Sequence, residues 1–276
     1  MLVVAIGYVF SVALNEPITV LIAIAVALFT TIGSYYHSDK IVLASTGAKP
    51  ADRERFAHYV NSVEGLALAA GIPCPRPYVI DDPALNAFAT GRDPEHAVIC
   101  VTTGLLEKLN RVELEGVIGH EMSHIKNYDI RFMTLVAVLV GSVALMANWF
   151  WWRARWGMGG RSRSRSGGQV QAIAFAIGLV LAILAPVATA AVQAMISRQR
   201  EFLADSNSAL LTRYPEGLAS ALEKISGDSN KLARTTKATS HLFISSPTKR
   251  DAVSRKAGLL DTHPPIEERI RRLREM

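Results

Sequence analysis

The sequence predicts a mainly α-helical protein with a small β-sheet, in which a soluble α+β domain is joined to about four hydrophobic membrane helices. Three observations lead to this fold class. Half of the 276 residues are hydrophobic and the mean hydropathy is positive, which is unusual for a soluble protein. Four apolar segments interrupt the chain. The other stretches mix polar and apolar residues with helical and strand-like periodicity, as a folded soluble domain does.

The apolar segments cover residues 1–14, 18–36, 132–152 and 171–197. The last three reach the length of about twenty residues at which a helix crosses the hydrocarbon core of a bilayer. The first is shorter, and since it has neither a basic start nor a small-residue cleavage site, we interpret it as a retained anchor and not as a signal peptide. The segments divide the chain into an N-terminal membrane anchor at 1–36, a soluble part at 37–131, a hydrophobic pair at 132–197 with a basic loop at 153–170, and a second soluble part at 198–276.

The first soluble part begins with a predicted amphipathic helix over roughly 52–70, which Gly71 and the proline-rich "IPCPRP" end. A small sheet is predicted by three short runs rich in β-formers and separated by turn residues: "PYVI" at 77–80, "NAFA" at 86–89 and "HAVICV" at 96–101. A second helix starts after Asn110, where Glu113 completes a capping signature. The second soluble part is predicted to be mostly helical.

The charge distribution argues against nucleic-acid binding. Five arginines of the basic loop, in "RARWGMGGRSRSRS", account for most of the net charge of +6, and no aromatic platform or recognition helix accompanies them. Basic residues after the second apolar segment place the soluble domain in the cytoplasm. The basic loop conflicts with that rule if both later segments cross, so either the rule fails there or this pair enters the membrane as a hairpin.

The stretch "GVIGHEMSHIKNYD" at 116–129 carries a metal-binding pattern. On a helix, His120 and His124 lie one turn apart on the same face, so both rings can aim a nitrogen at one ion. Glu121 points to the side of that face and can reach a metal-bound water without binding the metal. An apolar stripe on an adjacent side lets the same helix pack against a core: Leu114, Ile118 and Ile125.

A catalytic zinc site takes a third protein ligand and keeps one position open for water. The stretch "SRQREFLAD" offers that ligand, because Arg198, Glu201 and Asp205 fall on one face of a helix. We expect Glu201 to bind the metal, Asp205 to orient a ligating histidine through its other ring nitrogen, and Arg198 to balance the charge. A solvated charged helix end would explain the same spacing. Cys74 and Cys100 have no thiolate-ligand spacing, so we interpret them as small buried hydrophobes.

Five motifs in this order, "NAFATG", "VTTGLL", "HEMSH", "REFLAD" and "THPPIEERI", together with the apolar segments, resemble the HtpX family of membrane zinc metallopeptidases over nearly the whole chain. The resemblance implies a zincin-like catalytic domain with one zinc ion per chain, held by His120, His124 and Glu201, and with Glu121 as general base. It also implies that substrate lies along an edge strand formed by Asn86, Ala87, Phe88 and Ala89. An exposed edge offers backbone hydrogen bonds to any extended peptide.

The stretch "THPP" has two interpretations. As a helix start, Thr262 caps the helix and the prolines occupy its first turn. By the resemblance, His263 instead lies near the zinc and is a catalytic residue that stabilises the oxyanion. The remaining histidines have no ligand spacing, so we expect surface or packing roles for His37, His58, His96 and His241.

The spacing of the motifs predicts where the chemistry takes place. His124 precedes the third apolar segment by eight residues and Glu201 follows the fourth by four, which in a helix is roughly 12 Å and 6 Å of rise. The metal should therefore lie just outside the bilayer on the cytoplasmic side, and the expected substrates are unfolded proteins and cytosolic loops of membrane proteins. The resemblance implies a multi-pass protein of a bacterial-type inner membrane that acts in quality control.

Two other functions fit some of the motifs. A CAAX prenyl endopeptidase would share the zinc motifs but would be a longer chain with more membrane spans. A membrane scaffold with a structural metal would carry a closed four-coordinate site, whereas this ligand set leaves a position for water beside a glutamate. The lipid bilayer is an expected partner in each case, and the oligomeric state stays open.

Overall fold

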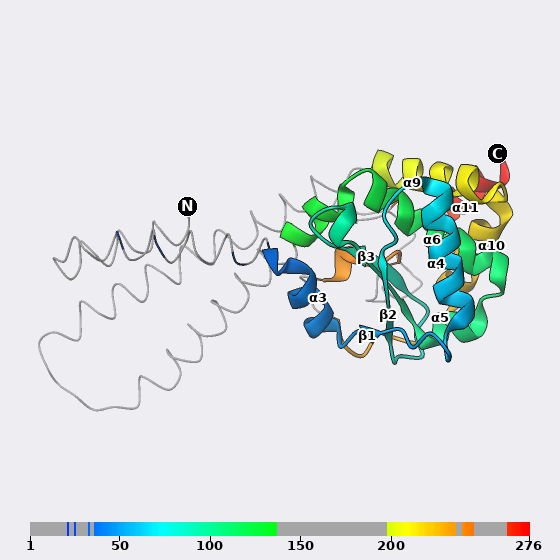
Figure 1. Cartoon of the computed structure of the whole chain (residues 1–276). Helices are drawn as coiled ribbons and strands as arrows, with labels where there is room; N and C mark the ends of the chain where they lie inside the picture. Colours follow the sequence, from blue (N-terminus) through cyan, green and yellow to red (C-terminus); the bar gives the residue numbers. More distant parts are fainter. Residues whose placement is uncertain are drawn as a thin grey trace, which may run out of the picture. The chain divides into compact units, whose positions relative to one another are not determined.

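The computed structural model describes residues 36–136, 198–235, 239–245 and 264–276, with residues 21, 25 and 33 in addition. Ser38–Val138 and Val192–Met276 form one compact unit (Figure 1), so the two soluble parts of the sequence fold together. The four predicted apolar segments lie almost entirely outside the described residues. Within the described part of the chain, no helix combines the length and the apolar character that crossing a bilayer requires.

A four-stranded sheet in the order β1-β2-β4-β3 crosses the compact unit. Its strands are β1 (Lys49–Pro50), β2 (Arg76–Ile80), β3 (Ala87–Thr90) and β4 (Val98–Thr102). β2 and β4 run parallel in the middle, while β1 and β3 pair antiparallel at the two edges. The three predicted strands are confirmed within two residues. The predicted start of the third at His96 is wrong because Pro94–His96 form a 3-10 turn that the Asp93 side chain caps.

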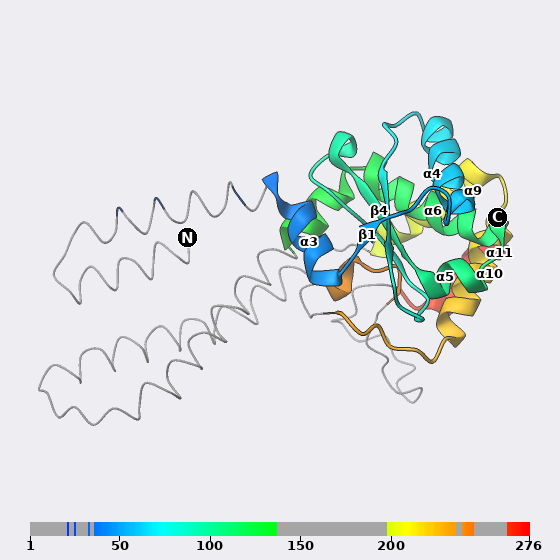
Figure 2. The ribbon, with the colours of Figure 1, turned by 60° about the horizontal axis from the view of Figure 1, so that its bottom comes forward.

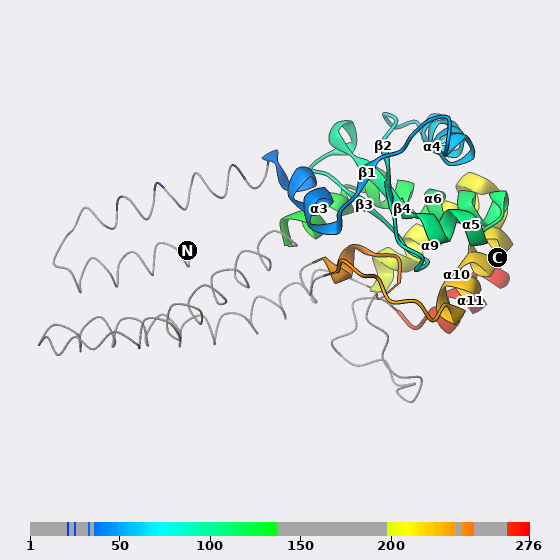
Figure 3. The ribbon, with the colours of Figure 1, turned by 90° about the horizontal axis from the view of Figure 1, so that it is seen from below.

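Helices cover both faces of this sheet. They are α3 (Ser38–Thr46), α4 (Ala57–Ala70), α5 (Thr103–Lys108), α6 (Arg111–Lys126), α9 (Arg198–Thr212), α10 (Pro215–Gly227) and α11 (Ile266–Arg274), with a 3-10 turn η2 (Ser240–Leu242). Figures 2 and 3 show α3 on one side of the strands and α4 and α6 on the other. The second soluble part is therefore mostly helical where it is described, as predicted.

The alternation of side chains along the strands sorts the core into two clusters. Val79 and Ile99 belong to the larger one, which α4, α6 and α10 complete. Their neighbours Ile80 and Cys100 point to the opposite face and pack with Val42 of α3. The strand at the edge nearest α6 is β3, so the sheet brings β3 beside the histidine motif.

The helix predicted over 52–70 ends where expected but begins five residues later. Gly71 ends α4 in the left-handed conformation, with φ at +68°. At the other end, Asp52 accepts hydrogen bonds from the backbone N–H groups of Glu54 and Arg55, both at 2.9 Å. Asp52 thus caps a separate turn, in which the Phe56 N–H donates to the Asp52 carbonyl at 2.9 Å, and Phe56, with φ at −115° and ψ at +36°, separates this turn from the helix. The predicted start is therefore wrong, and α4 begins at Ala57.

The predicted cap and buried face of α6 are confirmed. The Asn110 side chain accepts from the Glu113 N–H at 3.0 Å, and the Glu113 carboxylate accepts from the Asn110 N–H at 2.9 Å. The predicted apolar stripe is buried along its length: Leu114, Ile118 and Ile125. Together, the cap and the stripe fix the position and the rotation of the helix that carries the histidines.

A glycine lets α9 approach α6 closely. A Cβ atom on Gly119 would lie 2.9 Å from Ser208 Oγ of α9, closer than real Cβ contacts come. In the space that glycine leaves, the Ser208 hydroxyl donates to the Gly116 carbonyl at 2.6 Å. The helix that carries Glu201 is thereby held directly against the helix that carries His120.

Candidate metal centre

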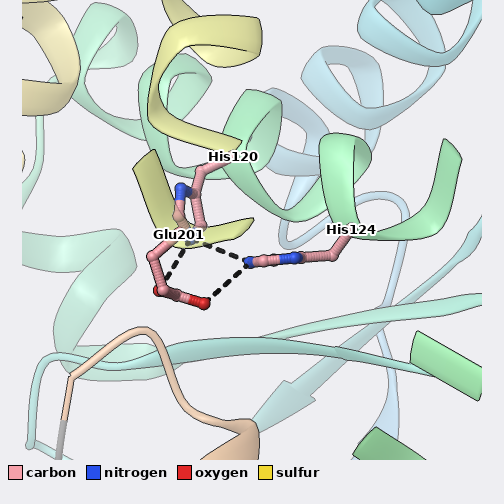
Figure 4. A group of neighbouring side chains, drawn as sticks. All are labelled: His120, His124 and Glu201. Carbon is pink, nitrogen blue, oxygen red and sulfur yellow. Dashed lines mark hydrogen bonds and ion pairs between the residues drawn. The ribbon is translucent and has the colours of Figure 1, made fainter. Parts of the chain in front are cut away.

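Two consecutive turns of α6 and the first turn of α9 bring three ligand-type side chains together (Figure 4). His120, His124 and Glu201 are all buried, and their ligand atoms lie within 4.8 Å of one another. The two Nε2 atoms are 3.2 Å apart. Glu201 Oε1 lies 3.5 Å from His124 Nε2, and Oε2 lies 3.8 Å from His120 Nε2. The three residues that the sequence singled out as ligands thus converge on one point.

This spacing fits a tetrahedral metal ion. Zinc–ligand distances of about 2.0–2.1 Å place neighbouring ligand atoms about 3.3 Å apart in such a site. The observed separations of 3.2, 3.5 and 3.8 Å are close to that value. Two imidazoles and a carboxylate are also a donor set that zinc accepts at a catalytic site, with a fourth position left for water.

Each histidine has a carboxylate on its other ring nitrogen. His120 Nδ1 lies 2.9 Å from Asp205 Oδ1, and His124 Nδ1 lies 3.1 Å from Asp129 Oδ2. A hydrogen bond at Nδ1 fixes the orientation of the ring and leaves the Nε2 lone pair for a metal. Asp205 therefore stands where the helix-face pattern predicts it, and Asp129 is a partner that was not predicted.

Asp129 was within reach of sequence reasoning, because it closes the same stretch that contains the histidines. α6 ends at Lys126, and Tyr128 adopts a left-handed conformation with φ at +59°. This reversal turns the chain so that the Asp129 carboxylate faces back towards His124. The signal was an acidic residue five positions after a ligand histidine, just beyond the end of the helix.

The sequence predicts that Arg198 balances the charge of this site, but the residue that pairs with Asp205 is Arg269. Arg198 is the first residue of α9 and is exposed, because a long charged side chain at a helix end stays hydrated. Arg269 comes from α11 and is 1% exposed. Its Nε and Nη2 atoms donate to the two Asp205 oxygens at 2.9 and 2.7 Å, and its Nη1 lies 3.8 Å from Glu201 Oε2.

Arg269 also left a signal in the sequence. It lies three residues after Ile266 and four before Leu273, both of which pack into the core. The arginine thus occupies the apolar stripe of α11, where a charged side chain is rarely found without a buried partner. The partner lies in another helix, so the sequence alone does not identify it.

Glu121 is buried beside the predicted substrate strand. This residue is 2% exposed, and its carboxylate accepts a hydrogen bond from the backbone of Ala89 in β3. Burial raises the pKa of Glu121 to about 7, and the charge of Glu201 acts in the same direction. A carboxyl group with this pKa can both accept and return a proton near neutral pH.

The two histidines differ in charge. Burial lowers the pKa of His120 to about 4, so this ring is neutral at pH 7. Burial acts in the same way on His124, but the hydrogen bond to Asp129 and the charge of Glu201 outweigh it and raise its pKa to about 9. Burial opposes the ionisation of Asp205, yet the Arg269 charge prevails and holds the pKa of Asp205 at about 2.

β3 is an edge strand, as expected, but its edge is not exposed. Ala87–Thr90 are at most 2% exposed. Residues Phe243–Ser245, called the covering segment below, lie along the outer side of β3, and Phe243 forms an isolated antiparallel bridge with Phe88. The expectation of an exposed edge over Asn86–Ala89 is wrong, because the chain supplies its own partner for the first part of the strand.

Some of the other residues named in the sequence analysis lie in the described part of the chain and some do not. The helix-start interpretation of "THPP" is wrong, because α11 begins at Ile266 with Pro265 as its N-cap, so the prolines precede the first turn. The role of His263 stays a prediction, since His263 lies outside the described residues. Surface positions are confirmed for His37, His58 and His96, whereas the His241 side chain is not described. Cys100 is buried as predicted. Cys74 is exposed, so the burial expected for it is wrong.

Comparisons with known proteins show what this chain is similar to. The family model described as peptidase family M48 matches residues 54–276. A protease HtpX homolog from Caldanaerobacter subterraneus is 48% identical over 99% of this chain and 90% of its own length. A protease HtpX homolog from Listeria monocytogenes is 42% identical over 90% of this chain and 86% of its own.

A solved structure shares the fold. The crystal structure of S. mikatae Ste24p aligns with a TM-score of 0.55 and 19% sequence identity, over 98% of this chain and 62% of Ste24p. At this identity, the likeness shows the fold alone. The family match and the relatives at more than 40% identity confirm the resemblance predicted from the five motifs. The chain belongs to peptidase family M48 and is an HtpX-like metalloprotease.

Proposed function

We propose that this metalloprotease is a zinc endopeptidase of a bacterial-type inner membrane, with one zinc ion per chain. The observation that carries the proposal is that both histidines have the same two kinds of carboxylate neighbour. Each Nδ1 faces a carboxylate, and both Nε2 atoms face Glu201. Burying this many ionisable groups at one point is costly unless they are paired or bind a metal.

The chemistry follows from the positions of the side chains. His120, His124 and Glu201 would hold the zinc ion, which when bound lowers the pKa of a water molecule and polarises the scissile carbonyl. Glu121 accepts a proton from the attacking water and later returns it to the leaving amine. A pKa near 7 suits both transfers. His263 is the proposed hydrogen-bond donor to the oxyanion.

The proposed substrate is an extended peptide that lies beside β3. Ala89 supports this position, because its backbone contacts Glu121 and it lies beyond the residues that the covering segment bridges. Pairing through backbone groups needs no particular side chain, so we expect a loose sequence preference. Unfolded proteins provide such peptides, whereas folded domains hold theirs in helices and sheets.

The proposed setting is the cytoplasmic face of the membrane, with cytosolic loops of misfolded or damaged membrane proteins as substrates. The support is the order of the sequence: α6 leads towards the apolar segment 132–152, and α9 follows the segment 171–197. Both ligand-bearing helices thus adjoin hydrophobic stretches. Mapping the cleavage sites in a membrane-protein substrate tests the setting, since cuts deep inside transmembrane segments would contradict it.

The test of the proposed function combines metal content with casein cleavage on detergent-purified full-length protein. The variants are Glu121→Ala, Glu201→Ala and, as a control on the same helix, Glu115→Ala, whose side chain pairs with Arg111. We expect one zinc in every protein except Glu201→Ala. We expect cleavage only in the wild type and the control.

Four outcomes would contradict parts of the proposal. Casein cleavage at the wild-type rate by Glu121→Ala would show that Glu121 is not the general base. A wild type that holds zinc but cleaves nothing would favour a scaffold with a structural metal. Full zinc content and activity in Glu201→Ala would place the third ligand elsewhere. Cleavage of prenylated CAAX peptides without any cleavage of casein would favour the prenyl endopeptidase.

A further inference from the structure

The covering segment is fixed by hydrogen bonds to β3 and to Asn86, the residue before it. The Ile244 N–H donates to the Ala87 carbonyl at 2.9 Å. The Asn86 side-chain amide donates to the Ser245 carbonyl at 3.0 Å. Phe243 and Ile244 are both buried. The segment is therefore part of the core, and it occupies the edge along which a substrate strand would continue.

The other backbone group of Ile244 reaches the metal centre. Its carbonyl accepts a hydrogen bond from Arg269 Nη1 at 3.2 Å. The same guanidinium holds both oxygens of Asp205, and Asp205 in turn faces His120 Nδ1 at 2.9 Å. Arg269 thus touches the covering segment with Nη1 and Asp205 with its other two nitrogens. It also lies close to two metal ligands, since Nη2 is 3.4 Å from each ring nitrogen of His120 and Nη1 is 3.8 Å from Glu201 Oε2.

A guanidinium is well suited to such a connection. It is planar and rigid, so its donors keep fixed directions and a shift at one contact changes the others. Arg269 is 1% exposed, so water does not replace a contact that is lost, and a buried unpaired donor is costly. A displacement of Ile244 would therefore disturb the contacts of Arg269 with Asp205, which faces His120 Nδ1.

We propose that Arg269 is a positioning residue that ties the covering segment on β3 to the metal ligand His120 through Asp205. The proposal rests on the proposed zinc site and substrate strand, and it adds a coupling between them. How firmly the covering segment lies on the strand then affects how tightly the metal is held. Substrate that displaces or extends this pairing acts on the metal ligands through Arg269.

The first test measures zinc affinity of the full-length protein in detergent, by competition with a chelator and without substrate. Arg269→Lys keeps the buried positive charge, so folding is less threatened than by removing it, but one ammonium cannot make all three contacts. We expect zinc to bind about 10- to 100-fold more weakly, the range for the loss of a group that orients a metal ligand.

The matched control is Arg274→Lys in the same helix. Arg274 is exposed, and its ion pairs run to Glu216 and Glu223 of α10, away from the metal ligands. Zinc affinity should therefore stay within about twofold of the wild type, the scatter expected for a distant surface site. An Arg269→Lys affinity inside the same range would overturn the positioning role.

The second test disturbs the far end of the connection. Asn86→Ala releases Ser245 without changing any side chain near the metal. We expect zinc affinity to fall by several-fold and KM for casein to change more than kcat. Thermal unfolding, followed in parallel, separates this effect from a general loss of folded protein. Wild-type zinc affinity in folded Asn86→Ala would overturn the coupling.

Zinc affinity and catalysis distinguish the two proposals. A wild type that binds zinc but cleaves nothing would contradict the proposed function, while the predicted order of zinc affinities among the variants would still hold. A wild type that cleaves casein, with equal zinc affinity in all variants, would contradict the coupling alone.

Discussion

The two sides of the metal centre are built in different ways. His124 takes its carboxylate from Asp129, five residues further along the chain. His120 takes Asp205 from α9, and Asp205 is held by Arg269, which is 64 residues away in α11. One side therefore forms within a single turn of chain, and the other exists only after three helices have docked. The motif supplies the ligands, while tertiary packing orients one of them.

The largest effect is expected on the packed side. Asp205→Ala leaves the buried Arg269 without its main partner, and breaking a buried ion pair by removing one member costs about 3–5 kcal/mol. We expect that loss in the free energy of unfolding of the metal-free protein, measured with denaturant. A loss below about 1 kcal/mol would show that the packed side does not depend on this pair.

A smaller effect is expected on the local side. Asp129 also lies 3.6 Å from Arg200, whose side chain is 33% exposed, so that charge can be hydrated when the carboxylate is gone. Asp129→Ala should cost about 1–2 kcal/mol of unfolding free energy and weaken zinc binding by roughly tenfold. Chelator competition measures the latter. Unchanged zinc affinity would mean that His124 is oriented without Asp129.

The two sides should also differ in proton release. At pH 8 His124, with a pKa of about 9, is still mostly protonated in the metal-free protein, while His120, with a pKa of about 4, is neutral. Zinc needs a neutral imidazole, so binding should release about one proton, and affinity should rise with pH up to about 9.

Calorimetric titration in buffers of different ionisation enthalpy counts this proton. Measurement at pH 8 limits the contribution of Glu121, because its pKa is about 7 and it is already mostly ionised there. Asp129→Ala should release less, since His124 loses the hydrogen bond that favours its charged form. Zinc binding without proton release would contradict the charge assigned to His124.

The smallest effect concerns the turn that returns Asp129 to His124. Tyr128 has φ at +59°, a conformation that β-branched residues strongly disfavour and glycine adopts freely. Tyr128→Val should therefore loosen the turn and weaken zinc binding a few-fold, whereas Tyr128→Gly should leave zinc affinity unchanged. Equal affinities in the two variants would show that the turn does not position Asp129.

The same contrast explains how much of the molecule the sequence could predict. The cap at Asn110, the buried stripe of α6 and the three strands depend on neighbours in sequence, and all are confirmed within two residues. Helical spacing also placed Glu201 and Asp205 correctly relative to His120 and His124.

Contacts between segments that are distant in the chain could not be predicted from the sequence. Arg198 and Arg269 are both arginines beside charged neighbours, and only the docking of α11 decides which one reaches Asp205. The covering segment on β3 depends on a hydrogen bond between Asn86 and Ser245, which is 159 residues later, and no local sequence pattern indicates this contact. The late start of α4 has a local cause, since Phe56 leaves the helical conformation after the turn that Asp52 caps.

The most direct test of the metal centre is anomalous X-ray diffraction at the zinc edge from crystals of the purified protein. We predict one strong peak per chain, about 2.0–2.2 Å from His120 Nε2, His124 Nε2 and a carboxylate oxygen of Glu201. Contact of both Nδ1 atoms with Asp205 and Asp129 should persist in the same crystals. A peak that lacks Glu201 among its ligands, or that is bound through Nδ1, would contradict the proposed metal centre.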